Sequence, residues 1–279
     1  MLTANYQKMT VPESFPLISL VIPTFNQGQY LPACVDHCLF QTYPNLELII
    51  VDGGSTDSTK EYLANLQNKI VTATHCPVVS MDGEGNIVRG KFLSYPQDRK
   101  ITILSFDQDI GPTSTYNEGF RKASGKYCTY VVGDDLPHPY MIEALAAVLE
   151  NQTVDFVYSD MNLVEDSGCI VRQMRLPDYD FKKCLADWFH LGVSKLYRTE
   201  LHDKIGLMDE AYTAANDYDH YLRFAMAGCQ FHHLPRVLYS IRWHGPERKT
   251  GQHTTSRYKI LMDESIKCAG RARMFLCES

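Results

Sequence analysis

The sequence predicts an α/β fold in which helices cover both faces of a mostly parallel central sheet. Two observations lead to this prediction. Short apolar runs rich in β-branched residues alternate three times with segments of helical periodicity between residues 17 and 132. The runs end at a proline or at acidic residues, which is typical of strands that lead into the loops of a parallel sheet.

The first half of the chain divides into strand–helix units. Strands are predicted at 17–23 ("LISLVIP") and 46–52 ("LELIIVD"), followed by helices at 30–41 and 53–67. The second helix is preceded by a glycine turn and by residues suited to cap a helix N-terminus. These two units form the start of a βαβ arrangement.

Two further strands complete the predicted parallel part. They are "KITILSFD" at 100–107 and "KYCTYVV" at 126–132, and the helix at 111–125 lies between them. Before them, a stretch at about 75–96 is longer than a usual loop and has two β-like arms around a glycine-containing turn. We therefore expect an inserted β-hairpin outside the main sheet.

The second half is less regular. We predict a helix at 141–152, a strand and turn at 155–168, a strand and short helix at 194–206, and a helix at 217–228. The run at 232–244 is predicted to be a final edge strand. A C-terminal helix is expected from about residue 256.

Composition limits the classes of function. The 279 residues are 44% apolar and 22% charged, with a net charge of −6 and no long basic run, which excludes a general nucleic-acid binder. The nine cysteines show neither a zinc-binding CxxC pattern nor a paired disulfide framework, so reduced thiols are expected. With no signal sequence and no apolar run near the roughly 20 residues of a membrane span, we expect a cytoplasmic protein.

Acidic side chains follow several of the predicted strands. Asp52, Asp109 and the adjacent pair Asp134 and Asp135 fall at or just beyond strand ends. Ligands of an open parallel sheet bind at the carboxyl ends of its strands. Several carboxylates there repel one another, and a divalent cation shared with phosphate oxygens is the usual counter-charge. A role as helix caps is the competing explanation for each of them.

The order of motifs resembles that of family 2 glycosyltransferases, the inverting nucleotide-sugar transferases of GT-A fold. The motifs are "VIPTFN", "QTYPN", "VDGGSTD", "GPTSTYNEGFRKASG", "GDD" and "NDYDHYLR", within about residues 18–244. The resemblance implies an enzyme that transfers a sugar from a nucleotide donor, with a UDP-sugar favoured, to an acceptor hydroxyl. It implies a glycan, lipid-linked or protein acceptor.

The resemblance also assigns the donor site. Pro23, Thr24 and Phe25 correspond to the loop that holds the nucleotide base, with Phe25 on the face of the base. Asp52 corresponds to the acid that reads the base edge. Because uracil and guanine both offer an imino N–H to a carboxylate, both bases remain open.

The adjacent acids correspond to the DxD motif of the fold. Asp134 would contact ribose or sugar, and Asp135 would coordinate Mn²⁺ or Mg²⁺ on the diphosphate. Arg242 and His244 lie where the family has a strand ending near the diphosphate. They are candidates for a phosphate ligand and a further metal ligand, respectively.

Asp217 corresponds to the acid of the family's catalytic "ED" motif and is the candidate general base, with helix capping as the alternative explanation. Asp219 is the second candidate at this site. Trp188 is a candidate platform for an acceptor sugar, although a role as a core anchor fits it equally well.

The chain departs from the family pattern at Gly53, Gly133 and Asn216, where acids or small polar residues are usual. For this reason a degenerate GT-A module, which binds nucleotide or a partner without turnover, is the alternative function. Dinucleotide-dependent and P-loop enzymes are excluded because the first turn is "PTFNQGQ" and no GxxxxGK[ST] motif exists.

The expected organisation is a lead-in at 1–16, a GT-A domain at 17–245, and a mobile loop with a C-terminal helix at 246–279. Within the domain, 17–136 would bind nucleotide and 137–245 would shape the acceptor site. The hairpin and the C-terminal helix are the surfaces expected to form a homodimer. An acceptor on a lipid carrier would require peripheral contact with a membrane.

Overall fold

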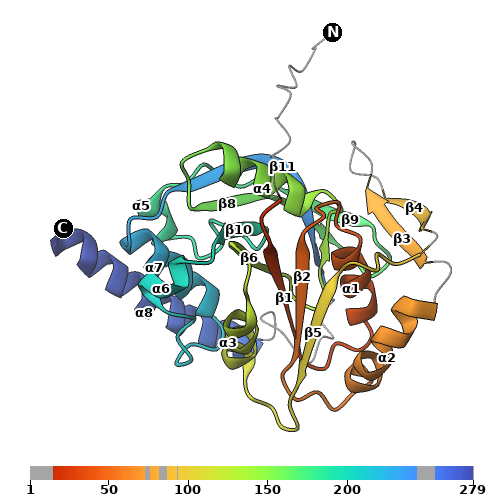
Figure 1. The fold of residues 1–279 in the computed structure, drawn as a ribbon. Helices are drawn as coiled ribbons and strands as arrows, with labels where there is room; N and C mark the ends of the chain where they lie inside the picture. The colour runs from red at the N-terminus through yellow and green to blue at the C-terminus, as the bar shows by residue number, and fades with distance from the viewer. Residues whose placement is uncertain (1–14, 73–75, 82–86, 93, 244–254, 279) are drawn as a thin grey trace.

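The computed structural model describes residues 15–72, 76–81, 87–92, 94–243 and 255–278. Its centre is a nine-stranded sheet with helices on both faces, as Figure 1 shows. The predicted α/β class is confirmed. The loop predicted at 246–254 and the candidate His244 lie outside the described residues.

The parallel part of the sheet is formed by the first half of the chain. Its strand order is β5 (Lys100–Ser105), β2 (Leu46–Asp52), β1 (Ile18–Thr24) and β6 (Tyr127–Tyr130). Strands β1 and β2 are buried along their whole length, which explains why they read as continuous apolar runs. All four predicted strands are present, in this parallel arrangement.

The sheet continues into the second half of the chain through antiparallel pairing. β10 (Lys195–Arg198) lies between β6 and β8 (Phe156–Val164), and β9 (Ile170–Met174) pairs with β8. β11 (Phe231–Arg242) runs parallel to β8 and also pairs with the two-residue β7 (Leu136–Pro137). β7 pairs only with Tyr239 and Ser240, so among the described residues 231–237 of β11 pair with β8 alone and lie at the edge of the sheet, as predicted for this strand.

A proline explains why the sequence of β11 resembles that of an edge strand. Pro235 has no backbone N–H, and the register of β11 against β8 shifts between Leu234 and Val237 and again before Tyr239. The irregularity accommodates the exposed proline in the half of β11 that lies at the edge of the sheet. The strand beyond it returns to regular pairing and carries Tyr239 and Arg242 toward the carboxyl edge of β6.

Helices cover the two faces of the sheet. α1 (Leu31–Leu39), α2 (Thr59–Thr72) and α4 (Met141–Asn151) pack on one face, in one cluster with Leu20 of β1. α3 (Pro112–Lys122), α6 (Leu201–Ile205) and α7 (Asn216–Met226) pack on the other, in one cluster with Val21. Alternate residues of β1 thus serve two cores, each formed by helices predicted from their apolar periodicity.

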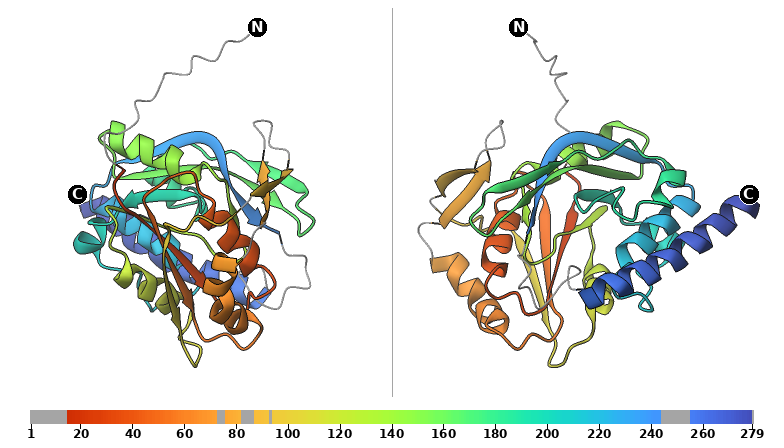
Figure 2. Two further views of the ribbon diagram at one scale, coloured as in Figure 1. Left: turned by 45° about the vertical axis from the view of Figure 1, so that its right-hand side comes forward. Right: turned by 180° about the vertical axis from the view of Figure 1, so that it is seen from behind.

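Two elements extend from this body at opposite ends, as both figures show (Figures 1 and 2). β3 (Cys76–Met81) and β4 (Ile87–Phe92) form a separate antiparallel hairpin, which confirms the predicted insertion. α8 (Thr255–Glu278) packs along α7, and the short α5 (Phe181–Cys184) contacts the same helix. Among the described residues, no helix combines the length and the apolar composition needed to cross a bilayer.

Candidate active site

The carboxyl ends of β1, β2 and β6 meet at one edge of the sheet. Thr24, the last residue of β1, is in register with Asp52 of β2. Beyond β6 the chain still follows β1, because the Gly133 N–H donates to the Pro23 carbonyl at 3.1 Å. Asp134 therefore enters the edge directly beside the loop that begins at Thr24, as the motif order predicts.

The residues predicted to hold the base lie together at the carboxyl ends of β1 and β2. Asp52 is fully buried and accepts from the Ser55 N–H at 2.9 Å and the Ser105 hydroxyl at 2.8 Å. Pro23 and Thr24 are also buried, whereas Phe25 is half-buried and thus retains accessible surface. A carboxylate oxygen has two lone pairs, so each oxygen retains capacity for a further N–H, but Asp52 has no accessible surface here and a ligand reaches it only if neighbouring side chains move.

The adjacent acids are anchored from β11. The Asp135 carboxylate accepts from the Tyr239 hydroxyl at 2.9 Å and from the Arg242 N–H at 3.0 Å. The Arg242 Nε donates to the Asp134 carbonyl at 3.0 Å, and its guanidinium lies 5.0 Å from the centroid of the Tyr30 ring. Asp134 and Asp135 are 4% and 6% exposed. The strand end and β11 thus hold two buried carboxylates beside one guanidinium.

The donor set of this pair suits a hard divalent cation. Among the described residues no three His, Cys, Asp or Glu side chains are gathered in a metal-binding cluster. Mg²⁺-like ions bound with nucleotides commonly take only one or two carboxylates and complete their shell with phosphate oxygens and water. The adjacent Asp134 and Asp135 fit that requirement.

Asp217 approaches the same region from the opposite side of the sheet edge. It is the second residue of α7, is half-buried, and accepts the Tyr218 N–H at 2.7 Å. Burial raises the pKa of the Asp217 carboxyl, and the nearby Lys195 opposes that rise. A carboxyl with a raised pKa and part of its surface accessible is suited to take a proton.

The pKa of Tyr116 indicates that Asp134, Asp135 and Asp217 lie near one another. Burial raises the pKa of Tyr116 on α3, and the negative charges of Asp217, Asp134 and Asp135 raise it further. Electrostatic influence of this kind falls off with distance. The adjacent acids and Asp217 therefore all lie near Tyr116, although they are more than 80 residues apart in the chain.

Asp217 does not occupy the N-cap of α7. The N-cap is Ala215, whose side chain accepts no hydrogen bond. The Glu264 carboxylate of α8 receives the N–H groups of Thr213, Ala214 and Ala215, which lead into α7, at 2.8–3.1 Å. Glu264 thus caps the segment before α7, whereas Asp217 accepts the first-turn N–H of Tyr218, so the capping explanation for Asp217 stands beside the explanation as a base.

Replacing Glu264 with alanine is expected to lower stability by about 1–2 kcal/mol, because three N–H groups at a helix start lose their acceptor. This corresponds to a fall in Tm of about 2–8 °C, measurable by thermal unfolding. Asp263→Ala is the matched control. Asp263 is the preceding residue of the same helix, is 55% exposed and pairs with Lys259 at the surface, so we expect little change. Equal Tm values for both variants would contradict the capping role.

The contacts of Asp219 favour a structural role over one in acceptor binding. It is fully buried, and its carboxylate is paired with Arg223 at 2.8 Å and with Arg271 of α8. Both carboxylate oxygens are therefore bound by guanidinium groups. Together with Glu264, this pair fixes α8 on α7.

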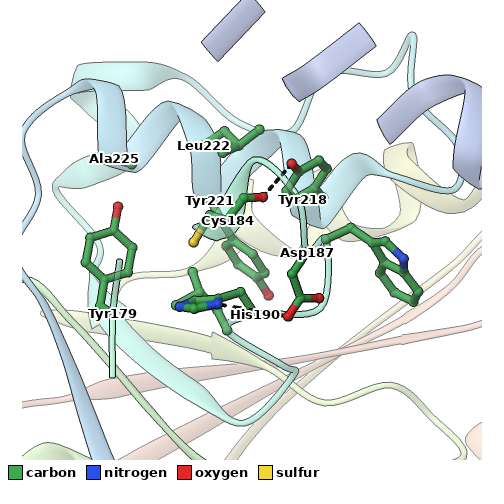
Figure 3. Close-up of a pocket in the computed structure, with 10 residues that line it drawn as sticks. Tyr179, Cys184, Asp187, His190, Tyr218, Tyr221, Leu222 and Ala225 are labelled. Atoms are coloured by element: carbon green, nitrogen blue, oxygen red, sulfur yellow. Dashed lines mark hydrogen bonds and ion pairs between the residues drawn. The ribbon is translucent and has the colours of Figure 1, made fainter. Parts of the chain in front are cut away.

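Trp188 lines a small pocket between α5 and α7, shown in Figure 3. The Tyr218 hydroxyl donates to the Cys184 carbonyl at 2.6 Å across this pocket, and Asp187 faces His190 at 4.0 Å. Trp188 is half-buried, so its ring is shared between the α7–α8 core and the surface. Both predicted roles for Trp188 fit this position.

Two residues of the site are not predicted from the sequence. Lys195 falls in a run that predicts only an ordinary strand, although a lysine within the apolar run "SKLYR" is unusual for a buried strand. Glu264 gives no local signal, because its acceptor role depends on a contact with residues about 50 positions earlier.

Comparisons with known proteins identify the family and the fold of this chain. The model of the family described as "Glycosyl transferase family 2" matches residues 19–206. The chain is 32% identical over 151 residues, 54% of its length, to the glycosyltransferase GlyG of Streptococcus pneumoniae serotype 4, and it spans 41% of that relative's length.

Two solved structures share the fold. S. aureus TarS 1–349 in complex with UDP-GlcNAc has a TM-score of 0.64 at 18% identity, covering 94% of this chain and 71% of that one. The mannosyltransferase PcManGT from Pyrobaculum calidifontis, in complex with GDP-Man and Mn²⁺, has a TM-score of 0.57 at 17% identity, covering 93% and 74%. The predicted GT-A fold is therefore confirmed. With the family model matching most of the chain, the protein belongs to glycosyl transferase family 2.

Proposed function

We propose that this protein is an inverting glycosyltransferase that moves a sugar from a nucleoside-diphosphate donor, with a UDP-sugar favoured, to an acceptor hydroxyl. The observation that carries the proposal is the pair Asp134 and Asp135, which β11 holds at the carboxyl edge of the parallel strands, together with Asp217 in the first turn of α7. A donor-binding acid pair and a separate acid able to take a proton are the two parts that such a transfer needs. Membership of the family supports the same assignment.

The nucleotide would lie along the edge formed by β1 and β2. Phe25, half-buried at the end of β1, offers a ring face to the base, and the buried Asp52 offers an acceptor to an imino N–H. The nearby Thr24 hydroxyl already donates to Gln27 at 3.0 Å, which fixes the loop that these residues share. A fixed loop loses little conformational entropy when the donor binds.

Asp135 would hold Mn²⁺ or Mg²⁺ together with the diphosphate, and the adjacent Asp134 would contact ribose or sugar. When bound, such an ion neutralises the charge of the departing nucleoside diphosphate as a Lewis acid. The structure of PcManGT in complex with GDP-Man and Mn²⁺ supports a divalent ion for this fold. Arg242, which is anchored to Asp134, would supply a further positive charge to the phosphates.

Asp217 would act as the general base. An acceptor hydroxyl that attacks the anomeric carbon in line must lose its proton as the new bond forms, and the sugar inverts in a single displacement. Asp217 is half-buried at the first turn of α7 and faces the donor acids across Tyr116. The acceptor would enter from the side of α7 and Trp188, and soluble glycan, lipid-linked and protein acceptors all fit this proposal.

The test is the Tm of the protein with UDP, GDP, CDP or dTDP, each with and without Mn²⁺. A ligand that binds only the native state raises Tm by mass action. At 100 times its Kd, the ligand adds about 2.7 kcal/mol to the free energy of unfolding. We expect a rise with UDP that requires Mn²⁺. The same rise with another nucleotide, and not with UDP, would mean that the donor sugar is carried by that nucleotide.

Metal-dependent hydrolysis of the corresponding nucleotide sugar then separates an enzyme from a binding module. Transferases of this kind pass the sugar to water slowly when no acceptor is present, so release of UDP from a UDP-sugar is expected. A metal-dependent rise in Tm without any release of UDP would favour the degenerate module. No rise with any nucleotide would overturn the proposed donor site.

A further inference from the structure

Lys195 is a lysine buried without a hydrogen-bond partner among the described residues. It begins β10, is 0% exposed, and its Nζ atom donates no hydrogen bond there. Lysine is almost never fully buried unless it is paired, because an amine without partners loses its hydration. A cost of this kind in a protein core calls for a compensating role.

The surroundings of Lys195 place it between β6 and α7. Its Nζ lies 3.2 Å from the centroid of the Tyr130 ring and 5.7 Å from that of Tyr221. The Tyr130 and Tyr221 hydroxyls are 2.8 Å apart. Tyr221 follows Asp217 by four residues on α7, so the two side chains lie on the same side of that helix. The amine is thus fixed by aromatic faces close to Asp217.

The charged groups that act on Lys195 are mostly acids of the proposed site. Burial lowers the pKa of Lys195, and Asp217, Asp135 and the Cys128 thiol oppose that change, in that order. Within the described part of the chain, the titratable groups that interact electrostatically with Asp217 are Lys195 on β10, Tyr116 on α3, Tyr130 on β6 and Tyr221 on α7. Lys195 is the only cation of these four.

We propose that Lys195 is a positioning residue that keeps Asp217 in its carboxylate form, ready to accept the proton of the acceptor hydroxyl. This inference rests on the proposed function, in which Asp217 is the base. Burial favours the protonated form of Asp217, and a protonated acid cannot take a proton. Asp217 and Asp135 favour the ammonium form of Lys195, and an ammonium held nearby favours the carboxylate form of Asp217. Full burial keeps Lys195 out of contact with donor and acceptor, so it acts on the reaction only through the charges of these acids.

The test is the pH dependence of UDP-GlcNAc hydrolysis by the whole protein and by Lys195→Met, which removes the charge and retains the length of the side chain. The carboxylate form of Asp217 exists above its pKa, and loss of Lys195 raises that pKa. The acid limb of the rate profile should therefore move to higher pH by about one unit or more, with an approximately tenfold lower rate on that limb for each unit. The Tm rise with UDP and Mn²⁺ should persist.

Tyr197→Phe is the matched control. Tyr197 lies two residues along β10 on the same face, and its hydroxyl contacts His202 at 3.2 Å, away from Asp217. Its acid limb should coincide with that of the unaltered protein. If the limb of Lys195→Met also coincides, the role of Lys195 is overturned while Asp217 remains the proposed base. A shift in both variants would overturn it as well, because it would show a general effect of altering β10.

A second measurement needs no activity. The Tm values of Lys195→Met, Asp217→Asn and the double variant form a cycle. Each single change leaves one buried group without its opposite charge, so the double variant should melt higher than the sum of the single changes predicts. Additive changes would overturn the pairing. If no nucleotide sugar is hydrolysed, the proposed function is overturned. The cycle of Tm values, which needs no activity, would then still test whether Lys195 and Asp217 interact.

Discussion

Asp217→Asn is expected to lower the rate of sugar transfer by about 10³-fold while leaving affinity for UDP and Mn²⁺ nearly unchanged. The amide has almost the same shape as the carboxylate but cannot accept the proton of the acceptor hydroxyl, and general bases contribute about 10²–10⁴-fold. The Asp217 carboxylate accepts the adjacent Tyr218 N–H, and an amide oxygen can accept that bond too. A loss confined to kcat would place Asp217 in the chemical step.

The measurement is UDP release from a UDP-sugar, with UDP affinity measured in parallel by the rise in Tm. Asp209→Asn is a suitable control, because Asp209 is an exposed carboxylate before α7 whose Oδ1 accepts the Ala211 N–H. That variant should retain its rate. Equal rates for Asp217→Asn and the unaltered protein would exclude Asp217 as the base. An equal loss of UDP affinity would instead indicate that Asp217 supports the donor site.

The parallel half of the fold could be predicted because its signals are local. Strands β1 and β2 are buried on both faces and so appear as unbroken apolar runs, and each is followed by a helix with one apolar side. The positions of Asp52 and of the adjacent Asp134 and Asp135 at the sheet edge followed from that topology. Neither result needed a contact between distant residues.

The second half of the site depends on contacts that no local pattern contains. Glu264 accepts N–H groups just before α7, although it lies about 50 residues later in the chain. Lys195 lies near Asp217 only because β10 is inserted between β6 and β8. The edge-strand prediction for β11 holds for 231–237, where the strand pairs with β8 alone among the described residues. The pairing of its second half with β7 depends on a contact about 100 residues apart in the chain, which no local pattern contains.

The departures from the family pattern have steric explanations. A Cβ atom at Gly133 would lie 2.7 Å from the Gln27 Oε1 and 2.9 Å from the Thr24 Oγ1, so no side chain fits there. A Cβ atom at Gly53 would lie 2.4 Å from the Thr115 Oγ1 of α3. Asn216, which stands where the family has an acid, donates to the Thr113 hydroxyl and accepts the Asp217 N–H. These residues serve close packing around the acids and remove none of the carboxylates that the proposed chemistry needs.

Asp135→Asn is expected to abolish the part of UDP affinity that depends on Mn²⁺. Carboxylates are preferred ligands of hard divalent cations, and a neutral amide oxygen both lowers the charge of the site and binds the ion more weakly. Asparagine is a more specific change than alanine here, because it removes the charge and retains an acceptor for the buried Tyr239 hydroxyl. That hydroxyl donates to Asp135 at 2.9 Å. Leaving that hydroxyl without an acceptor would cost about 1–3 kcal/mol and confuse folding with binding.

The measurement is the Tm of Asp135→Asn with UDP at a fixed concentration, with and without Mn²⁺, against the unaltered protein. Tyr239→Phe is the matched control, since it removes the hydrogen bond to Asp135 and leaves the carboxylate in place. We expect Tyr239→Phe to retain the increment that Mn²⁺ adds and Asp135→Asn to lose it. If Asp135→Asn keeps the whole increment in Tm that Mn²⁺ adds, the ion must be held by other ligands. Loss of the increment in both variants would mean that the orientation of the carboxylate, which Tyr239 and β11 impose, matters as much as its charge.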